Sequence, residues 1–351
     1  MDLIAIVASP LQALNVLEYS ERFGRKIDLV VVGGVSELEP SSRIQIEEVL
    51  SFLRPRQIIY VDFPRTRRLH KVRSTLTSGI SEVERHLSAT AYEIIVGEYR
   101  SPFPWSLLGK LSAAPRSVVV VDDGTATLRM DRRRRMPRSR EGWRLELRRN
   151  VFRMLGIRAA PPRSGLVFFT TYAIDGSIAE GDTIIRNDYR TLKASFKNLL
   201  PDEDAVYVLG ADVTSPHRVE SAEKASYELR LALELGHFAA EETGKKVIYV
   251  AHRRERSEKL DALRKEFTVV TPAVPFEIFP RTIGKQPRAI VTYCSSALVT
   301  AAELFGESVE LIALQLPREN LNDSWARVID GIYDYYQREV PKVRVVENPC
   351  S

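Results

Sequence analysis

The chain has 351 residues, of which 44% are hydrophobic and 28% charged, with a formal net charge of +5. This composition is ordinary for a soluble globular protein, and the length exceeds the size at which a single core stops growing, so two domains are expected. No apolar run is long enough to suggest a membrane span, and Cys294 and Cys350 are too few for a disulfide framework or a zinc site.

The first half of the sequence alternates strand-like apolar runs with amphipathic stretches. It enters a strand pattern at once, with no basic n-region and no cleavage site, so a cytoplasmic location is expected. Strands are predicted at 3–8, 27–32, 57–61, 93–96, 118–121 and 166–171, and helices at 11–23 and 42–53. Continuous runs of valine and isoleucine indicate strands that are buried on both faces of a parallel sheet.

The alternation resumes in the second half, after a region, 172–204, that shows no strong strand. Strands are predicted at 205–209, 246–250, 268–270, 288–292 and 310–314, and a long amphipathic helix at 322–338. The expected fold class is α/β, with two Rossmann-like domains facing each other across a cleft. We place the boundary near residue 195, so that 1–195 is the N-terminal domain and 196–351 the C-terminal domain. The final helix is expected to pack back on the first domain.

Two adjacent carboxylates, Asp122 and Asp123, follow the valine run 118–121 and precede Gly124. Ligands of open α/β sheets bind beyond the carboxyl ends of the strands, where a carboxylate can act as a general base toward a hydroxyl. On its own the pattern is more typical of a turn, in which Asp bonds its own backbone. The two are not a glycosidase pair, because neighbours in one loop cannot flank opposite faces of a sugar.

Polar residues also follow two predicted strands of the second half. His252 comes directly after 246–250, where an imidazole can donate a hydrogen bond to a leaving phosphate. Ser295 and Ser296 follow 288–292 and precede a helix-like run. A serine there is a good helix N-cap, and a helix N-terminus with serine hydroxyls is also suited to a phosphate, so the two interpretations are compatible.

Four further residues are candidates for the site. Glu277 precedes the serines and can accept from ribose hydroxyls, although an ordinary first-turn glutamate explains it equally well. Gly210 opens the second domain and lets the backbone approach a nucleotide, or is only a turn glycine. Gln12 follows the first strand, and Arg100 follows the strand at 93–96; both, together with Asp123, are candidates for the acceptor side of the cleft.

The positive charge is concentrated in one segment, 129–149. It holds ten arginines against three acidic residues, a net +7, so the rest of the chain carries −2. This argues against a nucleic-acid surface along the whole chain and for one basic loop and helix. The apolar spacing within it allows a basic amphipathic helix, which would bind an anionic membrane surface or an anionic acceptor; a solvated loop explains it equally well.

These motifs, in this order, resemble those of the bacterial sialyltransferases, in particular the polysialyltransferase and lipooligosaccharide sialyltransferase group. The family's D/E-D/E-G motif is matched by Asp122-Asp123-Gly124, and its serine pair by Ser295-Ser296. His252 stands at the position of the histidine of the family's HP motif. The start at 9–15, the segment 97–101 and Phe276-Glu277 are also similar, so the resemblance covers residues 9 to about 300. One departure is Arg253, which stands where the family has a proline that fixes the backbone.

The resemblance implies a B-type glycosyltransferase fold (GT-B) and an inverting transfer that needs no cofactor and no metal. The donor would be a CMP-linked sialic acid or another nonulosonic acid, and the acceptor a glycan or glycolipid in surface polysaccharide or lipooligosaccharide synthesis. By the resemblance, Asp122 is the base, His252 acts on the CMP phosphate, Ser295 and Ser296 hold that phosphate, and Glu277 holds the ribose. The protein would then be cytoplasmic or peripheral on the inner face of the membrane.

Two other functions fit the sequence. One is a B-type glycosyltransferase that uses a UDP- or GDP-sugar, although the second half shows no Gly-rich G-x-G-x-x-G loop for a diphosphate. The other is a non-enzymatic protein that binds nucleic acid or an anionic surface through 129–149. Aromatic residues are sparse in that segment, so platforms for base stacking are not evident and no nucleic-acid partner is expected.

Overall fold

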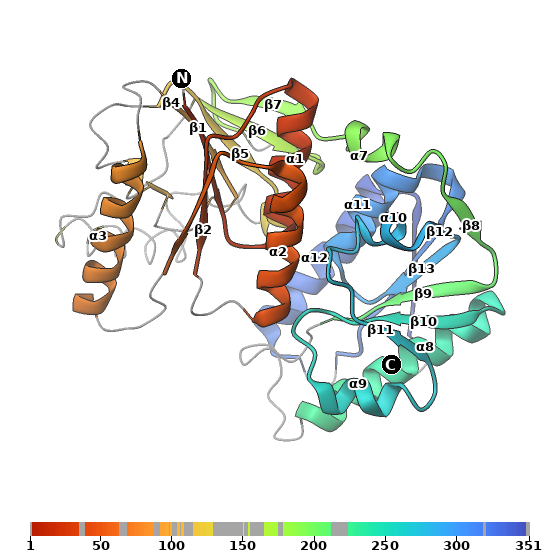
Figure 1. Ribbon diagram of the computed structural model, residues 1–351. Helices are drawn as coiled ribbons and strands as arrows, with labels where there is room; N and C mark the ends of the chain where they lie inside the picture. The colour runs from red at the N-terminus through yellow and green to blue at the C-terminus, as the bar shows by residue number, and fades with distance from the viewer. Residues whose placement is uncertain are drawn as a thin grey trace. The chain divides into compact units, whose positions relative to one another are not determined.

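The chain folds into two compact units, Met1–Asn187 and Asp188–Ser351, each built around its own parallel sheet. The structure is a computed structural model (Figure 1). It describes residues 2–34, 39–62, 69–87, 92–97, 99, 104–105, 107–108, 115–128, 150, 154, 165–174, 178–211, 224–318 and 321–348. Within these ranges the predicted pattern of strands and helices can be compared with the structure directly.

The first unit contains a seven-stranded sheet with the order β3-β2-β1-β4-β5-β6-β7, in which every neighbouring pair is parallel. Its strands are β1 (Asp2–Val7), β2 (Leu29–Gly33), β3 (Gln57–Val61), β4 (Tyr92–Val96), β5 (Val118–Val121), β6 (Leu166–Thr170) and β7 (Thr183–Arg186). The helices α1 (Pro10–Phe23) and α2 (Pro40–Leu53) lie on one side of the sheet and α3 (Leu69–His86) on the other (Figure 1). Helices on both faces explain why the central strands are apolar throughout.

The second unit repeats this topology with a six-stranded parallel sheet, ordered β11-β10-β9-β13-β14-β15. Its strands are β9 (Ala205–Leu209), β10 (Lys246–Val250), β11 (Thr268–Val270), β13 (Ala289–Thr292), β14 (Glu310–Leu314) and β15 (Val343–Val346). Its longer helices are α8 (Lys224–Thr243), α9 (Ser257–Leu263), α11 (Ser296–Phe305) and α12 (Asp323–Glu339), with the short α10 (Phe279–Ile283) and η3 (Gly306–Ser308). In Figure 1, α8 and α9 lie below this sheet and α10 and α11 above it.

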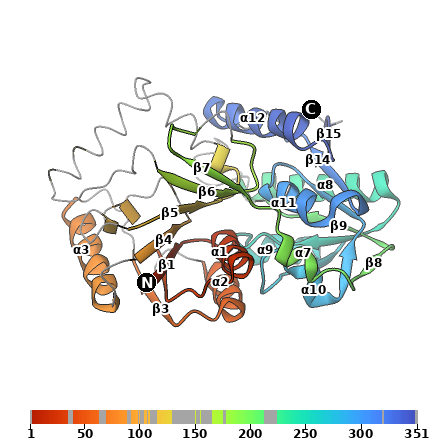
Figure 2. The same cartoon turned by 90° about the horizontal axis from the view of Figure 1, so that it is seen from above.

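In both sheets the order of the strands reverses at the strand that comes first in the sequence, although all the strands are parallel. This reversal creates the crevice where ligands of such folds bind. In the first unit the reversal lies between β1 and β4, and in the second between β9 and β13. Figure 2, seen from above, labels β3, β1, β4, β5, β6 and β7 of the first sheet in this order. Because all the strands of a sheet are parallel, their carboxyl ends share one edge, and loops that are distant in the sequence meet there. The α/β class with two Rossmann-like domains is thereby confirmed.

The division between the units falls at residues 187 and 188, somewhat before the predicted boundary near 195. The segment that follows it belongs to the second unit through its contacts with α11. In α7 (Arg190–Ala194), the Lys193 ammonium lies 3.7 Å from the Glu303 carboxylate. Beyond α7, the ring of Phe196 stacks on Phe305 with 5.5 Å between the centroids.

The region 172–204 holds no strong central strand, in line with the prediction, but it does contain two short strands. Its first strand, β7, is at the edge of the sheet, and none of its residues is buried. A short second strand, β8 (Leu200–Asp202), pairs with β12 (Lys285–Pro287) in a separate two-stranded sheet. Strands β12 and β15 were also not predicted. All four are short and at an edge, so their sequences lack the continuous apolar run that identifies a central strand.

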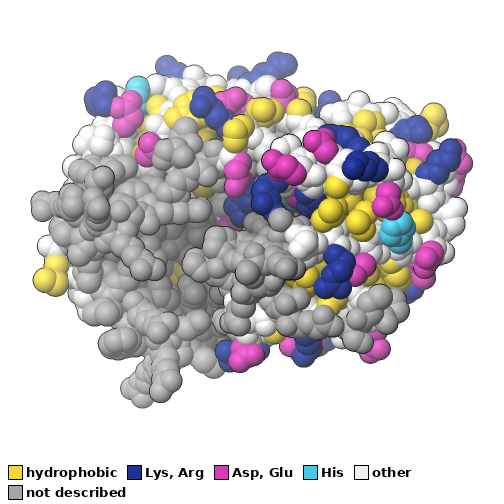
Figure 3. All heavy atoms as spheres, turned by 90° about the horizontal axis from the view of Figure 1, so that it is seen from below, with side chains coloured by type: hydrophobic (Ala, Val, Ile, Leu, Met, Phe, Trp, Pro, Cys, Tyr) yellow, Lys and Arg dark blue, Asp and Glu magenta, His cyan; other side chains and the backbone are white. Residues whose placement is uncertain are grey.

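Charged side chains of both signs are interspersed over the described residues on the face shown in Figure 3. The basic segment 129–149 lies outside the described residues, and so does Arg100. Among the described helices, none combines the length and the apolar character that crossing a membrane requires.

The stacked pair Phe196–Phe305 provides a test of the boundary between the units. Phe196 is 6% exposed, so Phe196→Ala should lower the free energy of unfolding of the second unit by about 3–5 kcal/mol through lost burial and a cavity. Urea unfolding that follows each unit separately would measure this. Leu200, which is 72% exposed, is the control, and Leu200→Ala should change stability by less than about 0.5 kcal/mol. A loss confined to the first unit would contradict the assignment.

Candidate functional site

The Asp122 carboxylate is buried at the carboxyl end of β5 and accepts hydrogen bonds from the neighbouring strand's end. The Thr170 hydroxyl donates to Oδ1 at 2.6 Å, and the Thr171 backbone N–H donates to Oδ2 at 2.7 Å. The residue is only 2% exposed. A buried carboxylate is tolerated when its oxygens are hydrogen-bonded, so these contacts tie the ends of β5 and β6 together.

A second layer of polar contacts extends this tie to α1 and β7. The Asn15 amide of α1 donates to the Asp122 carbonyl at 3.1 Å. The Asn187 amide, just after β7, donates to Asn15 Oδ1 at 3.0 Å, and the Thr171 hydroxyl donates to the Asn187 carbonyl at 3.1 Å. Asn15 and Asn187 are fully buried. We name Asn15, Asp122, Thr170, Thr171 and Asn187 the buried polar network.

Burial raises the pKa of Asp122 to about 6, despite the opposing effects of the hydrogen bonds from Thr170, Thr171 and Thr127 and of the charge of Arg186. An aspartate in water has a pKa of about 3.9. Desolvation of the ionised form is the largest cause, and the hydrogen bonds recover only part of that cost. The surroundings of the Asp122 carboxyl thus raise its pKa and also shield it from solvent.

Asp123 has a different environment, although it is the next residue. It is half-buried, and its Oδ1 accepts from the Gln12 amide at 2.8 Å and from the Ser9 hydroxyl at 3.4 Å. The Ala8 N–H holds Gln12 Oε1 at 2.6 Å, so the amide nitrogen faces Asp123. Asp123 therefore lies at the ends of β1 and β5 with its oxygen oriented by two donors.

Gly97, at the end of β4, completes this arrangement by having no side chain. A Cβ atom at this position would overlap the Gln12 side chain. Gln12 is 2% exposed and occupies the crevice between the ends of β1 and β4, where the sheet reverses. The structure thus brings together Gln12, Asp122 and Asp123 at one edge, as the sequence predicted.

In the second unit, His252 follows β10 and lies in a tight turn. The Glu255 N–H donates to the His252 carbonyl at 2.9 Å, which closes the turn. The Arg254 N–H donates to His252 Nδ1 at 3.3 Å. Because Nδ1 is the acceptor in that bond, the ring proton belongs on Nε2, which is then a donor for a ligand oxygen.

Ser295 and Ser296 lie at the start of α11, at the end of β13. The Ser295 hydroxyl accepts from the Ala297 N–H at 3.2 Å, so Ser295 is the N-cap, and Ser296 is the first residue of the helix. From α12, the Tyr336 hydroxyl donates to the Ser295 carbonyl at 2.7 Å. The helix start is therefore held in place from the neighbouring helix as well as by its own cap.

Glu277 contacts the same helix one turn later. Its Oε1 accepts from the Thr300 hydroxyl at 2.9 Å, and the residue is 6% exposed. Burial raises the pKa of Glu277, opposed by its own backbone N–H, the Thr300 hydroxyl and the charge of Arg253. Arg253 is the residue after His252, so its charge acts on Glu277 from the turn that follows β10.

Gly210, at the end of β9, lies against the same turn. A Cβ at this position would overlap the Glu255 carboxylate and would come within 2.9 Å of the His252 backbone nitrogen. Its N–H donates to the Val250 carbonyl of β10 at 2.9 Å. Gly210 thus allows close approach between the ends of β9 and β10, a use that the sequence did not suggest, and its approach to a nucleotide stays a prediction.

The sequence reasoning overlooked several residues that shape these sites. Asn15, Thr170 and Asn187 gave no signal, because their roles depend on contacts across 48 to 172 residues of sequence. Glu255 carried one usable signal, since it lies three residues after His252, the spacing of a tight turn. Among the described residues, no group of three or more His, Cys, Asp or Glu side chains is placed to hold a metal ion.

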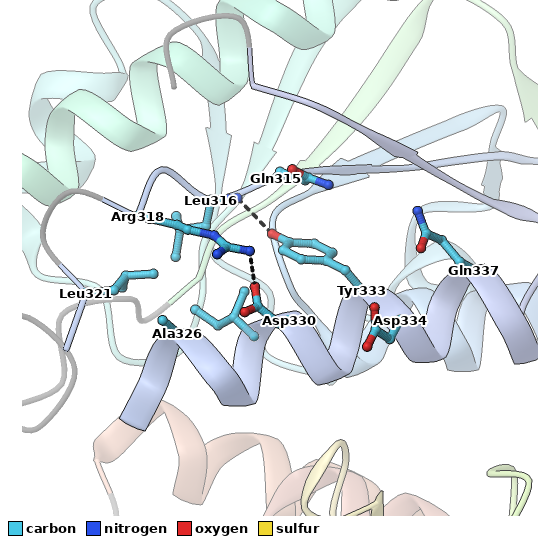
Figure 4. Close-up of a pocket in the computed structure, with 10 residues that line it drawn as sticks. Gln315, Leu316, Arg318, Leu321, Ala326, Asp330, Tyr333, Asp334 and Gln337 are labelled. Carbon is cyan, nitrogen blue, oxygen red and sulfur yellow. Dashed lines mark hydrogen bonds and ion pairs between the residues drawn. The ribbon is translucent and has the colours of Figure 1, made fainter. Parts of the chain in front are cut away.

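A pocket of about 290 Å³ lies within the second unit, between the loop after β14 and α12 (Figure 4). The Tyr333 hydroxyl on its wall accepts from the Leu316 N–H at 2.9 Å, and Arg318 pairs with Asp330 at 2.6 Å. Its lining residues are Gln315, Leu316, Arg318, Leu321, Ala326, Ile329, Asp330, Tyr333, Asp334 and Gln337. None of the residues predicted for the site lines it.

Comparison with solved structures identifies the architecture. The 2,6-sialyltransferase of a Photobacterium species, solved with CMP and lactose, matches with a TM-score of 0.54 and 10% sequence identity, over 98% of this chain and 78% of that one. The UDP-GlcNAc 2-epimerase of Methanocaldococcus jannaschii, solved with UDP-GlcNAc and UDP, matches with a TM-score of 0.50 and 14% identity, over 99% and 89%.

The chain has the GT-B fold. At these identities the likeness shows the fold alone, which glycosyltransferases and sugar-nucleotide epimerases share. No protein-family model matches the sequence, and no curated protein matches it.

The raised pKa of Asp122 predicts how stability depends on pH. Below about pH 4 the carboxyl is protonated in both folded and unfolded chains; above pH 6 it is ionised in both, and the buried charge costs stability. The stability of the wild type relative to Asp122→Asn should therefore fall by about 3 kcal/mol between pH 4 and pH 7. Urea unfolding of both proteins across this range measures the difference. Parallel profiles would show that Asp122 titrates as in water.

Proposed function

We propose that this protein is an inverting glycosyltransferase that moves sialic acid, or a related nonulosonic acid, from a CMP-linked donor to a glycan hydroxyl. The observation that supports it most is the contrast between two adjacent carboxylates at the edge of the first sheet. Asp122 is buried in the polar network, whereas Asp123 is half-buried and oriented by Gln12 and Ser9. A base for an incoming hydroxyl has to reach that hydroxyl, and Asp123 is the one nearer solvent.

In this proposal Asp123 accepts the proton of the acceptor hydroxyl and Asp122 holds the loop that carries it. The resemblance to sialyltransferases assigned the base to Asp122, and that assignment stays a prediction to be tested beside the new one. Both oxygens of Asp122 already accept hydrogen bonds from Thr170 and Thr171. Asp122 is 2% exposed with these bonds formed, whereas Asp123 is half-buried and lies nearer the solvent from which an acceptor would arrive.

The donor would bind at the strand ends of the second unit. His252 would donate from Nε2 to the phosphate of CMP, and the start of α11 with Ser296 would offer N–H and hydroxyl donors to the same group. The Ser295 hydroxyl accepts the N-cap bond and keeps its own O–H to donate to the same phosphate. Glu277 would accept from ribose hydroxyls, and Gly210 would leave room for the nucleotide.

The proposed reaction breaks the bond between the anomeric carbon and the phosphate oxygen, and CMP leaves with the electron pair. The acceptor oxygen forms the new bond on the opposite face, and its proton passes to Asp123. The anomeric carbon of a sialyl donor bears a carboxylate and ionises toward an oxocarbenium ion. Stabilising the charge on the leaving phosphate and deprotonating the acceptor are therefore the two tasks left to the protein, and no metal is needed for either.

The acceptor class and the setting follow from the resemblance and from charge. A glycan or glycolipid of surface polysaccharide or lipooligosaccharide synthesis is the proposed acceptor. The +7 segment 129–149 would hold an anionic acceptor or rest on the anionic inner face of the membrane. A cytoplasmic enzyme that is peripheral at the membrane would meet lipid-linked acceptors there.

A second candidate is a GT-B enzyme that acts on a UDP-sugar, because one structural neighbour is an epimerase solved with UDP-GlcNAc and UDP. A thermal-shift screen with CMP, UDP, GDP and CTP separates the two. The proposal expects CMP to raise the melting temperature more than UDP or GDP does, since ligand binding to the folded state stabilises it. A larger shift with UDP would favour the second candidate. A salt-sensitive shift of RNA in a gel, without CMP binding, would favour a nucleic-acid-binding protein.

Paired variants decide which carboxylate is the base. Asp123→Asn should lower turnover with a CMP-sialic acid donor by at least about two orders of magnitude, with donor affinity nearly unchanged. Asp122→Asn keeps the shape of the buried side chain and should lower turnover less. Steady-state kinetics and CMP titration measure both. If Asp122→Asn loses the larger factor and Asp123→Asn turns over normally, the base is Asp122.

His252→Ala tests the donor side. Loss of its donor to the phosphate should lower turnover by about 10²–10⁴-fold and weaken donor binding. Hydrolysis of the CMP-sugar without acceptor should fall with it, because that reaction has the same leaving group. Survival of both reactions in His252→Ala would remove His252 from the phosphate site.

A further inference from the structure

We propose that Glu255 is a positioning residue that fixes His252 for catalysis, together with Lys259 and Tyr249. This inference rests on the proposed function, in which His252 acts on the donor phosphate. The contacts that support it lie within the second unit and join β9, β10, the His252 turn and α9. We name Glu255, Lys259 and Tyr249 the glutamate clamp.

Glu255 holds both backbone groups of His252. Its carboxylate Oε2 accepts from the His252 N–H at 2.7 Å, and its own N–H donates to the His252 carbonyl at 2.9 Å. Rotation about the backbone of His252 would break one bond or the other, so the two together restrict the direction of the imidazole.

The other carboxylate oxygen anchors Glu255 to two different elements. Oε1 accepts from the Tyr249 hydroxyl of β10 at 2.6 Å and from the Lys259 ammonium of α9 at 2.5 Å. The side chains of Lys259 and Glu255 are 5% and 2% exposed. Burial, followed by the negative charge of Glu255, raises the pKa of Tyr249 well above its ordinary value, so its hydroxyl stays a donor.

The end of β9 closes the clamp from the side opposite α9. A Cβ at position 210 would overlap Glu255 Oε2, so the glycine lets the carboxylate lie directly against the strand end. Gly210 thus serves the clamp as well as the proposed nucleotide site. Oε2 therefore lies beside the Gly210 backbone while it accepts from the His252 N–H.

A buried ion pair is a poor way to gain stability, because the desolvation of both charges offsets most of their attraction. Apolar side chains of similar size would stabilise the same packing equally well. What the carboxylate supplies, and an apolar side chain does not, is an acceptor aimed at the His252 N–H. A proline at position 253 would fix the φ angle of that residue, but Arg253 does not. The shape of the turn therefore depends on these hydrogen bonds.

The first unit contains a matched control. The Glu47 Oε1 also accepts from a tyrosine hydroxyl, that of Tyr60, at 3.2 Å, and from a basic residue four positions away, Arg43, at 2.8 Å. Arg43 and Glu47 are 51% and 42% exposed, and Glu47 has no contact with the proposed site residues of its unit among the described interactions. Glu47→Ala therefore removes contacts of the same kind, with a tyrosine hydroxyl and a basic side chain, at an exposed position.

The first measurement is amide hydrogen exchange at His252, followed by NMR in the full chain. In Glu255→Ala the exchange of this amide should be at least about ten times faster than in the wild type, because its acceptor is gone. Glu255→Gln retains an acceptor oxygen and should lie between the two, and Glu47→Ala should match the wild type. Unchanged exchange in Glu255→Ala would overturn the clamp, whatever reaction the protein catalyses.

The second measurement connects the clamp to catalysis. With a CMP-sialic acid donor, Glu255→Ala should lower turnover by about tenfold or more, because a displacement of about 1 Å at a reacting group has large effects. In a His252→Ala background the same substitution should have no further effect on turnover. Losses that multiply would mean that Glu255 acts on overall structure and not through His252. If the wild type does not use any CMP-sugar, the proposed function fails, and hydrogen exchange alone still decides whether Glu255 holds His252.

Discussion

The burial of the Asp122 carboxylate is the constraint on which the first unit's site depends. Taking an ionised group out of water is costly, and here the cost is reduced by a hydroxyl and a backbone N–H from the end of the adjacent strand. Those bonds fix the ends of β5 and β6 relative to each other, and the two asparagines add α1 and β7. With the backbone held at Asp122, the next side chain has to leave the network, which directs Asp123 toward Gln12.

The second unit uses a buried carboxylate in a similar way. There Glu255 joins β10, α9 and the end of β9, and the residue that it holds is His252. In both units a shielded acid therefore sets the direction of a more accessible polar side chain at the carboxyl edge of a parallel sheet. Substrate-contacting groups need to be rigid before the substrate arrives, and buried hydrogen-bonded charges provide rigidity that surface contacts do not.

The central strands of the fold could be predicted from the sequence, because they are apolar, and the edge strands could not. The central strand 118–121 is an unbroken apolar run, and 246–250 is one after Lys246, so both were predicted with their observed bounds. The edge strands β7 and β15 carry polar residues on an exposed side and gave no such run. The different burial of Asp122 and Asp123 could not be predicted from the local sequence. It depends on Thr170, Thr171 and Gln12, which are distant in sequence. Placing polar residues after strands located the site, but the partners that assign their roles come from the tertiary fold.

The central claim is that the strand ends of the two units serve transfer from a CMP-linked sugar. The most direct measurement is phosphorus NMR, together with mass spectrometry of the acceptor, on the purified protein with CMP-sialic acid and a panel of glycan acceptors that includes lactose, beside a parallel sample with UDP-GlcNAc. The account predicts that CMP accumulates together with an equal amount of sialylated acceptor, and that UDP-GlcNAc stays unchanged. Consumption or epimerisation of UDP-GlcNAc, with CMP-sialic acid left intact, would contradict it.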